Sequence, residues 1–173
     1  MNLSYDTNMK TIILTGMMGS GKSTIGKLLA EKLNAKLIEI DNLIEKFEQT
    51  TISEIFKNKG EEYFRNIEQE IIFDNFKSEN QIISLGGGTF ENAKTRDFLL
   101  KNAIVIYLKT SEKIIYERIK NDKSRPLLCD NMTIENIENI IKKREQNYQT
   151  ATYTIVTDNK NPQDLTDEII GVI

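Results

Sequence analysis

The sequence predicts a three-layer α/β/α fold with a five-stranded parallel sheet. Short apolar runs rich in β-branched residues indicate strands at 11–15, 36–40, 81–85, 103–108 and 152–157. Segments with helical spacing of apolar residues separate these runs, and such β-α alternation is typical of a parallel sheet covered on both faces. A glycine-rich turn after the first run indicates a ligand site at the carboxyl edge of the sheet.

The composition is that of an ordinary globular protein. The 173 residues fit one domain, with 39% hydrophobic and 28% charged residues. The net charge of −3 favours no nucleic acid partner, and no apolar run approaches the roughly 18–20 residues of a membrane span. The single cysteine, Cys129, fits a reducing cytoplasm, and the polar segment 1–9 resembles a disordered extension rather than a signal peptide. Because histidine is absent, proton transfer falls to Asp, Glu, Lys or Tyr.

The strongest motif is GMMGSGKST at residues 16–24, between the first predicted strand and an amphipathic helix. This strand–turn–helix context identifies a phosphate-binding loop, the P-loop, because consecutive N–H groups at a helix N-terminus bind anions. Lys22 would reach the β- and γ-phosphates of a nucleotide, and the Ser23 hydroxyl would bind Mg²⁺. The sequence therefore predicts a protein that binds a nucleoside triphosphate.

Two carboxylates follow at the end of the second predicted strand. Glu39 and Asp41 are two residues apart, so strand alternation would place both on one face at the carboxyl edge. Asp41 could instead cap a helix that begins at Asn42, and this role is compatible with catalysis. Beside a phosphate loop we favour the functional interpretation.

The region 41–77 is longer than one crossover helix requires and indicates a helical substrate-binding region. Thr51 and Glu54 form a capping box that opens a helix, and Gly60 ends it. In the longer helix that follows, Arg65 lies close to the apolar stripe. This arginine could project into a pocket, although a solvated surface position is the alternative.

Two later stretches complete the candidate site. Gly86, Gly87 and Gly88 follow the third predicted strand and would let a ligand or a helix approach the backbone closely, although a flexible turn is the alternative. The polar segment 121–132 has no periodicity and contains Arg125, so it predicts a mobile lid over phosphates. A long surface loop is the alternative for that segment.

A small-molecule kinase fits these features better than other P-loop proteins. There is no guanine-reading N-K-x-D motif, and the third strand ends in Ser84-Leu85-Gly86 rather than in an acidic pair. A kinase of this kind needs positioning, charge neutralisation and a base for the acceptor hydroxyl. The residues available are Lys22, Ser23, Asp41, Arg65, Arg125 and Arg144. An ATP-binding regulatory protein without phosphoryl transfer is an alternative of a different class.

The ordered motifs resemble the shikimate kinase family, in the nucleoside-monophosphate-kinase-like P-loop group. They are GMMGSGKSTIGKLLA at 16–30, FRNIE at 64–68, SLGGG at 84–88, RPLL at 125–128 and KRE…Y at 143–148. The resemblance implies the P-loop kinase fold and transfer of a phosphoryl group from ATP to the 3-hydroxyl of shikimate, with Mg²⁺ as cofactor. Gluconate or nucleotide kinases share the P-loop and lid but do not explain the glycine run or the arginines. We expect a monomer.

The resemblance also implies a role for each matching residue. Asp41 would take or orient the proton of the 3-hydroxyl, and Lys22 and Arg125 would complete the catalytic group. Arg65 and Arg144 would bind the substrate carboxylate. The implied ATP-binding residues are Gly19, Ser20, Gly21, Lys22, Ser23, Thr24, Arg118, Arg125, Lys160 and Pro162. The remaining implied contacts are those of Gly86, Gly87 and Gly88 with the substrate ring and those of Ser23 and, through water, Glu39 with Mg²⁺.

One position departs from the family pattern. The family usually has Asp where this chain has Glu39. The longer side chain keeps the charge but displaces its oxygens by roughly one C–C bond, about 1.5 Å. We therefore expect Mg²⁺ binding with an altered affinity.

Overall fold

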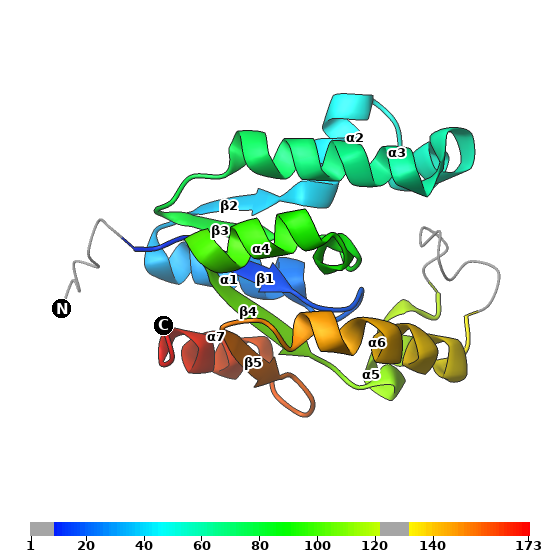
Figure 1. Ribbon diagram of the computed structural model, residues 1–173. Coiled ribbons are helices and arrows are strands. Elements are labelled where there is room, and N and C mark those ends of the chain that lie inside the picture. Colours follow the sequence, from blue (N-terminus) through cyan, green and yellow to red (C-terminus); the bar gives the residue numbers. More distant parts are fainter. Residues whose placement is uncertain (1–8, 122–131) are drawn as a thin grey trace.

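The computed structural model describes residues 9–121 and 132–173 and contains a five-stranded, all-parallel sheet with helices on both faces (Figure 1). The strands are β1 (Ile12–Thr15), β2 (Lys36–Glu39), β3 (Gln81–Ser84), β4 (Ile104–Lys109) and β5 (Tyr153–Val156). The helices are α1 (Lys22–Leu33), α2 (Ile40–Glu48), α3 (Ile52–Asn75), the 3₁₀ turn η1 (Thr89–Glu91), α4 (Ala93–Asn102), α5 (Glu112–Ile119), α6 (Ile134–Tyr148) and α7 (Pro162–Ile170). The predicted three-layer fold class is confirmed.

The sheet order β2-β3-β1-β4-β5 puts the first strand at the centre. Ile13 of β1 is aligned with Ile83 of β3 on one side and with Val105 of β4 on the other. All three side chains are fully buried. Sheets covered on both faces favour such apolar strands, which explains why short apolar runs in the sequence could predict the strand positions.

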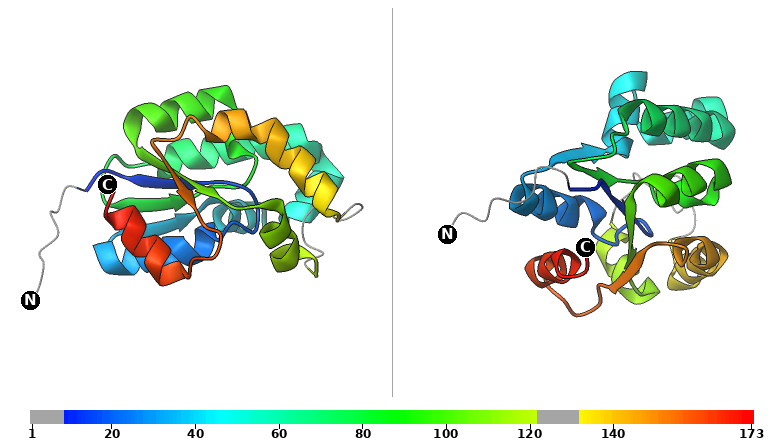
Figure 2. Two further views of the ribbon diagram at one scale, coloured as in Figure 1. Left: turned by 90° about the horizontal axis from the view of Figure 1, so that it is seen from below. Right: turned by 60° about the vertical axis from the view of Figure 1, so that its left-hand side comes forward.

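Successive side chains of the central strand β1 point to opposite faces of the sheet and pack into two different cores. Ile13 belongs to a core with α2, α3, α4 and α6, whereas Ile12 and Leu14 belong to a core with α1 and α7. Figures 1 and 2 show the sheet between these two helical layers. A third, smaller core joins Met17 of the phosphate loop to α5 and α6. The phosphate loop is therefore anchored by β1, which precedes it, and by the packing of Met17 against α5 and α6.

The helical region between β2 and β3 follows the local sequence signals. The Thr51 hydroxyl accepts a hydrogen bond from the Glu54 N–H, and the Glu54 carboxylate accepts one from the Thr51 N–H, so the predicted capping box is present. Gly60 interrupts α3 with non-helical angles, φ 83° and ψ 170°. Glycine adopts this conformation without a Cβ clash, and the predicted break is confirmed.

Element boundaries differ from the prediction at β2. The strand ends at Glu39, and Ile40 begins α2 instead of ending the strand. Ile40 and Ile44 are both fully buried on the core-facing side of α2, so helical packing of these residues replaces the strand pattern there. Within the described ranges, no helix combines the length and the apolar character needed to cross a bilayer.

Candidate active site

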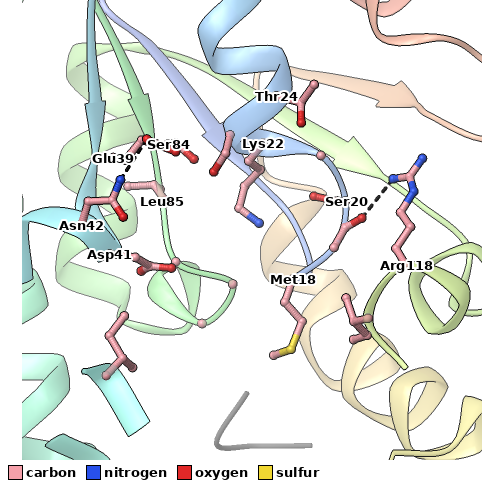
Figure 3. A pocket seen from close by; sticks show the side chains of 18 of the residues that line it. Met18, Ser20, Lys22, Thr24, Glu39, Asp41, Asn42, Ser84, Leu85 and Arg118 are labelled. Carbon is pink, nitrogen blue, oxygen red and sulfur yellow. Dashed lines mark hydrogen bonds between the residues drawn. The ribbon is translucent and has the colours of Figure 1, made fainter. Parts of the chain in front are cut away.

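The predicted site residues converge on a cleft of about 790 Å³ at the carboxyl edge of the sheet (Figure 3). Its lining follows the ends of β1, β2 and β3 and adds side chains from α3, α5, α6 and α7. The predicted residues that line it are Gly19, Ser20, Gly21, Lys22, Ser23, Thr24, Glu39, Asp41, Arg65, Gly86, Gly87, Gly88, Arg118, Arg144, Lys160 and Pro162. Segments far apart in the chain thus form one site.

The phosphate loop is closed on itself by its lysine. The buried Lys22 ammonium donates hydrogen bonds to the carbonyls of Gly16 and Met17, at 2.8 and 2.9 Å. Gly21 precedes α1 with φ 98°, a left-handed conformation that favours glycine. In the described part of the chain no side chain caps α1, and its first turn carries no acidic residue. The positive end of this helix therefore faces the cleft and suits an anion.

Hydroxyl groups surround the same helix terminus. Ser23 and Thr24 lie in the first turn of α1 and are exposed, whereas Ser20 is buried within the loop. Both exposed residues line the cleft. The Ser23 hydroxyl is thus accessible as an oxygen ligand for a metal ion that arrives with phosphates.

Glu39 and Asp41 both line the cleft, but not for the predicted reason. Asp41 lies in the first turn of α2 and not on β2, so strand alternation does not relate the two carboxylates. Asp41 is not the N-cap either, because that position is Glu39, whose carboxylate accepts a 2.9 Å hydrogen bond from Asn42 Nδ2. Figure 3 shows Glu39 and Asp41 across the cleft from Met18 and Ser20 of the phosphate loop. The side chain of Lys22 lies between these two sides. Asp41 thus lies in the first turn of α2, near the positive end of the helix dipole.

The glycine run is packed against charged side chains. A Cβ at Gly86 would lie 2.7 Å from Glu68 Oε1 and 3.0 Å from Asp41 Oδ1, so two carboxylates converge above this residue. A Cβ at Gly88 would overlap the guanidinium of Arg65. The three glycines are therefore a close-contact surface rather than a flexible turn.

Arg65 is held beside this surface by a buried carboxylate. Its Nη1 lies 2.7 Å from Glu68 Oε2, and its Nη2 lies 3.2 Å from Glu61 Oε1. Only 18% of the Arg65 side chain is exposed, so it is not the solvated surface arginine of the alternative interpretation. Thr89 Oγ1 donates to the second Glu68 oxygen at 2.5 Å. Burial raises the pKa of Glu68, and the adjacent Arg65 opposes that rise.

Arg144 enters the cleft from α6. Its buried guanidinium donates from Nη1 to the Gly87 carbonyl at 3.0 Å and contacts the sulfur of Met17 at 3.8 Å. Arg65 and Arg144 thus flank the glycine run from two different helices, α3 and α6. Two guanidinium groups on one turn suit a bound carboxylate.

The predicted ATP-binding residues outside the phosphate loop that the structure describes also line the cleft. Arg118 of α5 donates from Nη1 to the Gly19 carbonyl at 3.0 Å, which keeps its guanidinium beside the phosphate loop (Figure 3). Lys160 pairs with Glu168 of α7 at 2.6 Å, and Pro162 begins that helix. Arg125 lies outside the described residues, as do nearly all of the predicted lid and the extension at 1–8.

Sequence reasoning assigned no role to Glu68, Thr89 and Tyr148. Glu68 is 2% exposed and Tyr148 is 1% exposed, and the Tyr148 hydroxyl donates to the Gly87 carbonyl. Glu68 lies on the apolar face of α3, three residues after Arg65. A carboxylate at an apolar helical position was the available signal, because such a group is rarely buried without a partner.

The comparisons with known proteins identify the family of this chain. A sequence model of the family described as shikimate kinase matches residues 18–173. The shikimate kinase of Sulfurihydrogenibium sp. strain YO3AOP1 is 43% identical, covering 95% of this chain and 98% of that protein. The shikimate kinase of Persephonella marina is 42% identical, and the match covers 95% of this chain and 99% of that protein. The structure of shikimate kinase from Acinetobacter baumannii in complex with shikimate has a TM-score of 0.92 and 33% identity, covering 96% of this chain and 93% of that one.

These matches extend over almost all of the chain, from the phosphate loop to the last helix. The matched range 18–173 spans the elements that form the cleft, including α3, the turn after β3 and α6. The chain belongs to the shikimate kinase family.

Proposed function

We propose that the chain transfers the γ-phosphoryl group of ATP to the 3-hydroxyl of shikimate, giving shikimate 3-phosphate and ADP in aromatic amino acid biosynthesis. Membership of the family supports this reaction. The observation that carries the proposal is that one cleft contains a phosphate loop, the carboxylate of Asp41 and two guanidinium groups beside a glycine run. These are the groups that a kinase for a hydroxylated acid requires.

The residues divide between the two substrates. Lys22 and the N-terminus of α1 would hold the phosphates of ATP and neutralise the charge that develops on the transferred group. Asp41, across the cleft, would accept the proton of the acceptor hydroxyl as that oxygen attacks the γ-phosphorus. Arg65 and Arg144 would bind the carboxylate of shikimate and so fix which hydroxyl faces ATP.

Mg²⁺ generally accompanies ATP in such reactions and supplies additional neutralisation of phosphate charge. In the described part of the chain, no group of three or more His, Cys, Asp or Glu residues could hold a metal. A Mg²⁺ ion bound mainly through phosphates and water needs only about one or two protein oxygens. Ser23 fits the direct position, and Glu39 fits a contact through water, because both line the cleft.

The other expectations from the sequence are part of this proposal. The relative from A. baumannii was solved with shikimate, which supports shikimate as the acceptor rather than gluconate or a nucleotide. We place the protein in the cytoplasm as a monomeric single domain with ATP and shikimate as partners. A regulatory ATP-binding protein would have no use for an acid-binding half of the cleft, and we do not favour it.

The test is ADP release by the purified protein with ATP and Mg²⁺, measured with and without shikimate. We expect shikimate to stimulate ADP release in the wild-type protein. Asp41→Asn should lower kcat by roughly 10²- to 10⁴-fold and leave the KM for ATP unchanged. If shikimate has no effect while ATP still binds, the proposed acceptor is wrong, and gluconate and nucleotides become the next acceptors to assay.

A further inference from the structure

The carbonyl of Gly87 accepts two side-chain hydrogen bonds. One comes from the buried hydroxyl of Tyr148, and the other comes from Arg144 Nη1 at 3.0 Å. Both donors belong to α6 and are four residues apart, so they project from one face of the same helix. Because a carbonyl oxygen has two lone pairs, this acceptor is saturated and its direction is fixed.

Gly87 also touches the phosphate loop. A Cβ at this position would lie 3.1 Å from the Met18 nitrogen and 3.6 Å from the Gly16 carbonyl oxygen. The backbone of the glycine run is therefore wedged between the loop on one side and α6 on the other. A shift of the Gly87 peptide would change the spacing between the two halves of the cleft.

The direction of this carbonyl determines the direction of the next amide. The described residues contain no cis peptide bond, so the N–H of Gly88 points opposite to the Gly87 carbonyl and away from α6. Gly88 lines the cleft and lies against the guanidinium of Arg65. The Gly88 N–H and Arg65 are thus two donors beside the same space.

Tyr148 is well suited to hold this peptide. Its ring stacks on Tyr107 with centroids 4.8 Å apart and an interplanar angle of 24°. Burial raises the pKa of the Tyr148 hydroxyl to about 12, so it remains a donor at neutral pH. The hydroxyl of Tyr107 instead donates to Glu145 Oε2 at 2.7 Å. The two stacked rings therefore differ in what their hydroxyls hold.

We infer that Tyr148 is a positioning residue, whose hydroxyl fixes the Gly87–Gly88 peptide so that the Gly88 N–H is presented to the acid substrate. This inference rests on the proposed function, because the acid is taken to be shikimate. Arg144 would bind the substrate carboxylate while also holding Gly87, whereas Tyr148 would act only through the backbone. This role predicts that loss of the Tyr148 hydroxyl changes the KM for the acid more than the KM for ATP.

The kinetic test compares Tyr148→Phe with Tyr107→Phe. Each variant removes one hydroxyl from the same stacked pair, and only the first removes a bond to the cleft backbone. We expect Tyr148→Phe to raise the KM for shikimate about two- to tenfold, the effect of one neutral hydrogen bond, with a smaller change in the KM for ATP. Tyr107→Phe should leave both KM values unchanged. Equal changes for both substrates, or equal effects of both variants, would overturn the inference.

A second measurement needs no substrate. The ¹⁵N chemical shift of the Gly88 amide responds to hydrogen bonding at the Gly87 carbonyl, so it should move in Tyr148→Phe and stay in place in Tyr107→Phe. An unmoved Gly88 resonance in Tyr148→Phe would overturn the inference whatever the acceptor is. A wild-type protein that releases no ADP with shikimate would instead overturn the proposed function, and the Gly88 resonance would still decide whether Tyr148 sets this peptide.

Discussion

Replacing Arg65 with alanine should weaken both substrate binding and the fold, and the two effects can be separated. Glu68 is 2% exposed, and its charge is balanced by Arg65 Nη1 at 2.7 Å. Removing one partner of a buried ion pair lowers the free energy of unfolding by about 3–5 kcal/mol. Because 18% of the Arg65 side chain is exposed to solvent, we expect the lower end, about 3 kcal/mol.

The loss should depend on pH in a definite direction. Burial raises the pKa of Glu68, and without the opposing cation of Arg65 that pKa rises further. A carboxyl group whose pKa is higher in the folded than in the unfolded state stabilises the fold when protonated. This stabilisation is present at acidic pH and is lost as the pH rises through the folded-state pKa. Arg65→Ala should therefore be destabilised less at pH 5 than at pH 8.

A double variant provides the control. Arg65→Ala combined with Glu68→Gln has no buried charge at this position, so it should regain most of the lost stability. Its KM for shikimate should stay raised by roughly ten- to a hundredfold, the effect of a lost charged hydrogen bond. Urea unfolding followed by far-UV circular dichroism suits a chain without tryptophan. A pH-independent loss, or a double variant no more stable than Arg65→Ala, would refute the reasoning.

Three further variants test single contacts. Lys22→Ala should abolish ADP release, because it removes the ammonium that would neutralise the phosphates of ATP in the loop; residual turnover near the wild-type rate would contradict its role. Gly88→Ala should raise the KM for shikimate about tenfold or more, because its Cβ would displace Arg65. Its φ of −106° suits alanine, so any fall in the melting temperature should come from the disturbed Arg65–Glu68 pair and not from backbone strain. Glu39→Asp should shift the Mg²⁺ concentration needed for half-maximal rate, and an unchanged titration would exclude Glu39 from the metal site.

Local signals predicted much of the fold. The capping box at Thr51, the break at Gly60 and the proline that begins α7 are each determined by residues within one helical turn, and all three are present. The strands were readable because a sheet buried on both faces requires continuous apolar runs. The boundary between β2 and α2 at Ile40 could not be predicted, because an isoleucine fits a strand and a buried helix face equally well.

The site was predictable in its members more than in its contacts. The phosphate loop and the glycine run carry residue types that few other structures require. The partners of these residues depend on tertiary packing, so the sequence did not reveal that Glu68 is buried beneath Arg65 or that Tyr148 reaches the Gly87 carbonyl. The spacing of Arg65 and Glu68 is also that of an ordinary solvent-exposed helical pair, so only the position of Glu68 among apolar residues could have indicated its burial.

The central position of β1 has a consequence for synthesis on the ribosome. Ile12 pairs with Ile82 of β3 and with Ile104 of β4, so both neighbours of the first strand are translated long after it. At a synthesis rate of about 5–20 residues per second, several seconds pass between translation of the phosphate loop and translation of the strands that pair with β1. The apolar strand β1 is exposed in that interval. The first strand should therefore become paired on both sides only when β4 emerges, before α6 and α7 complete the cleft.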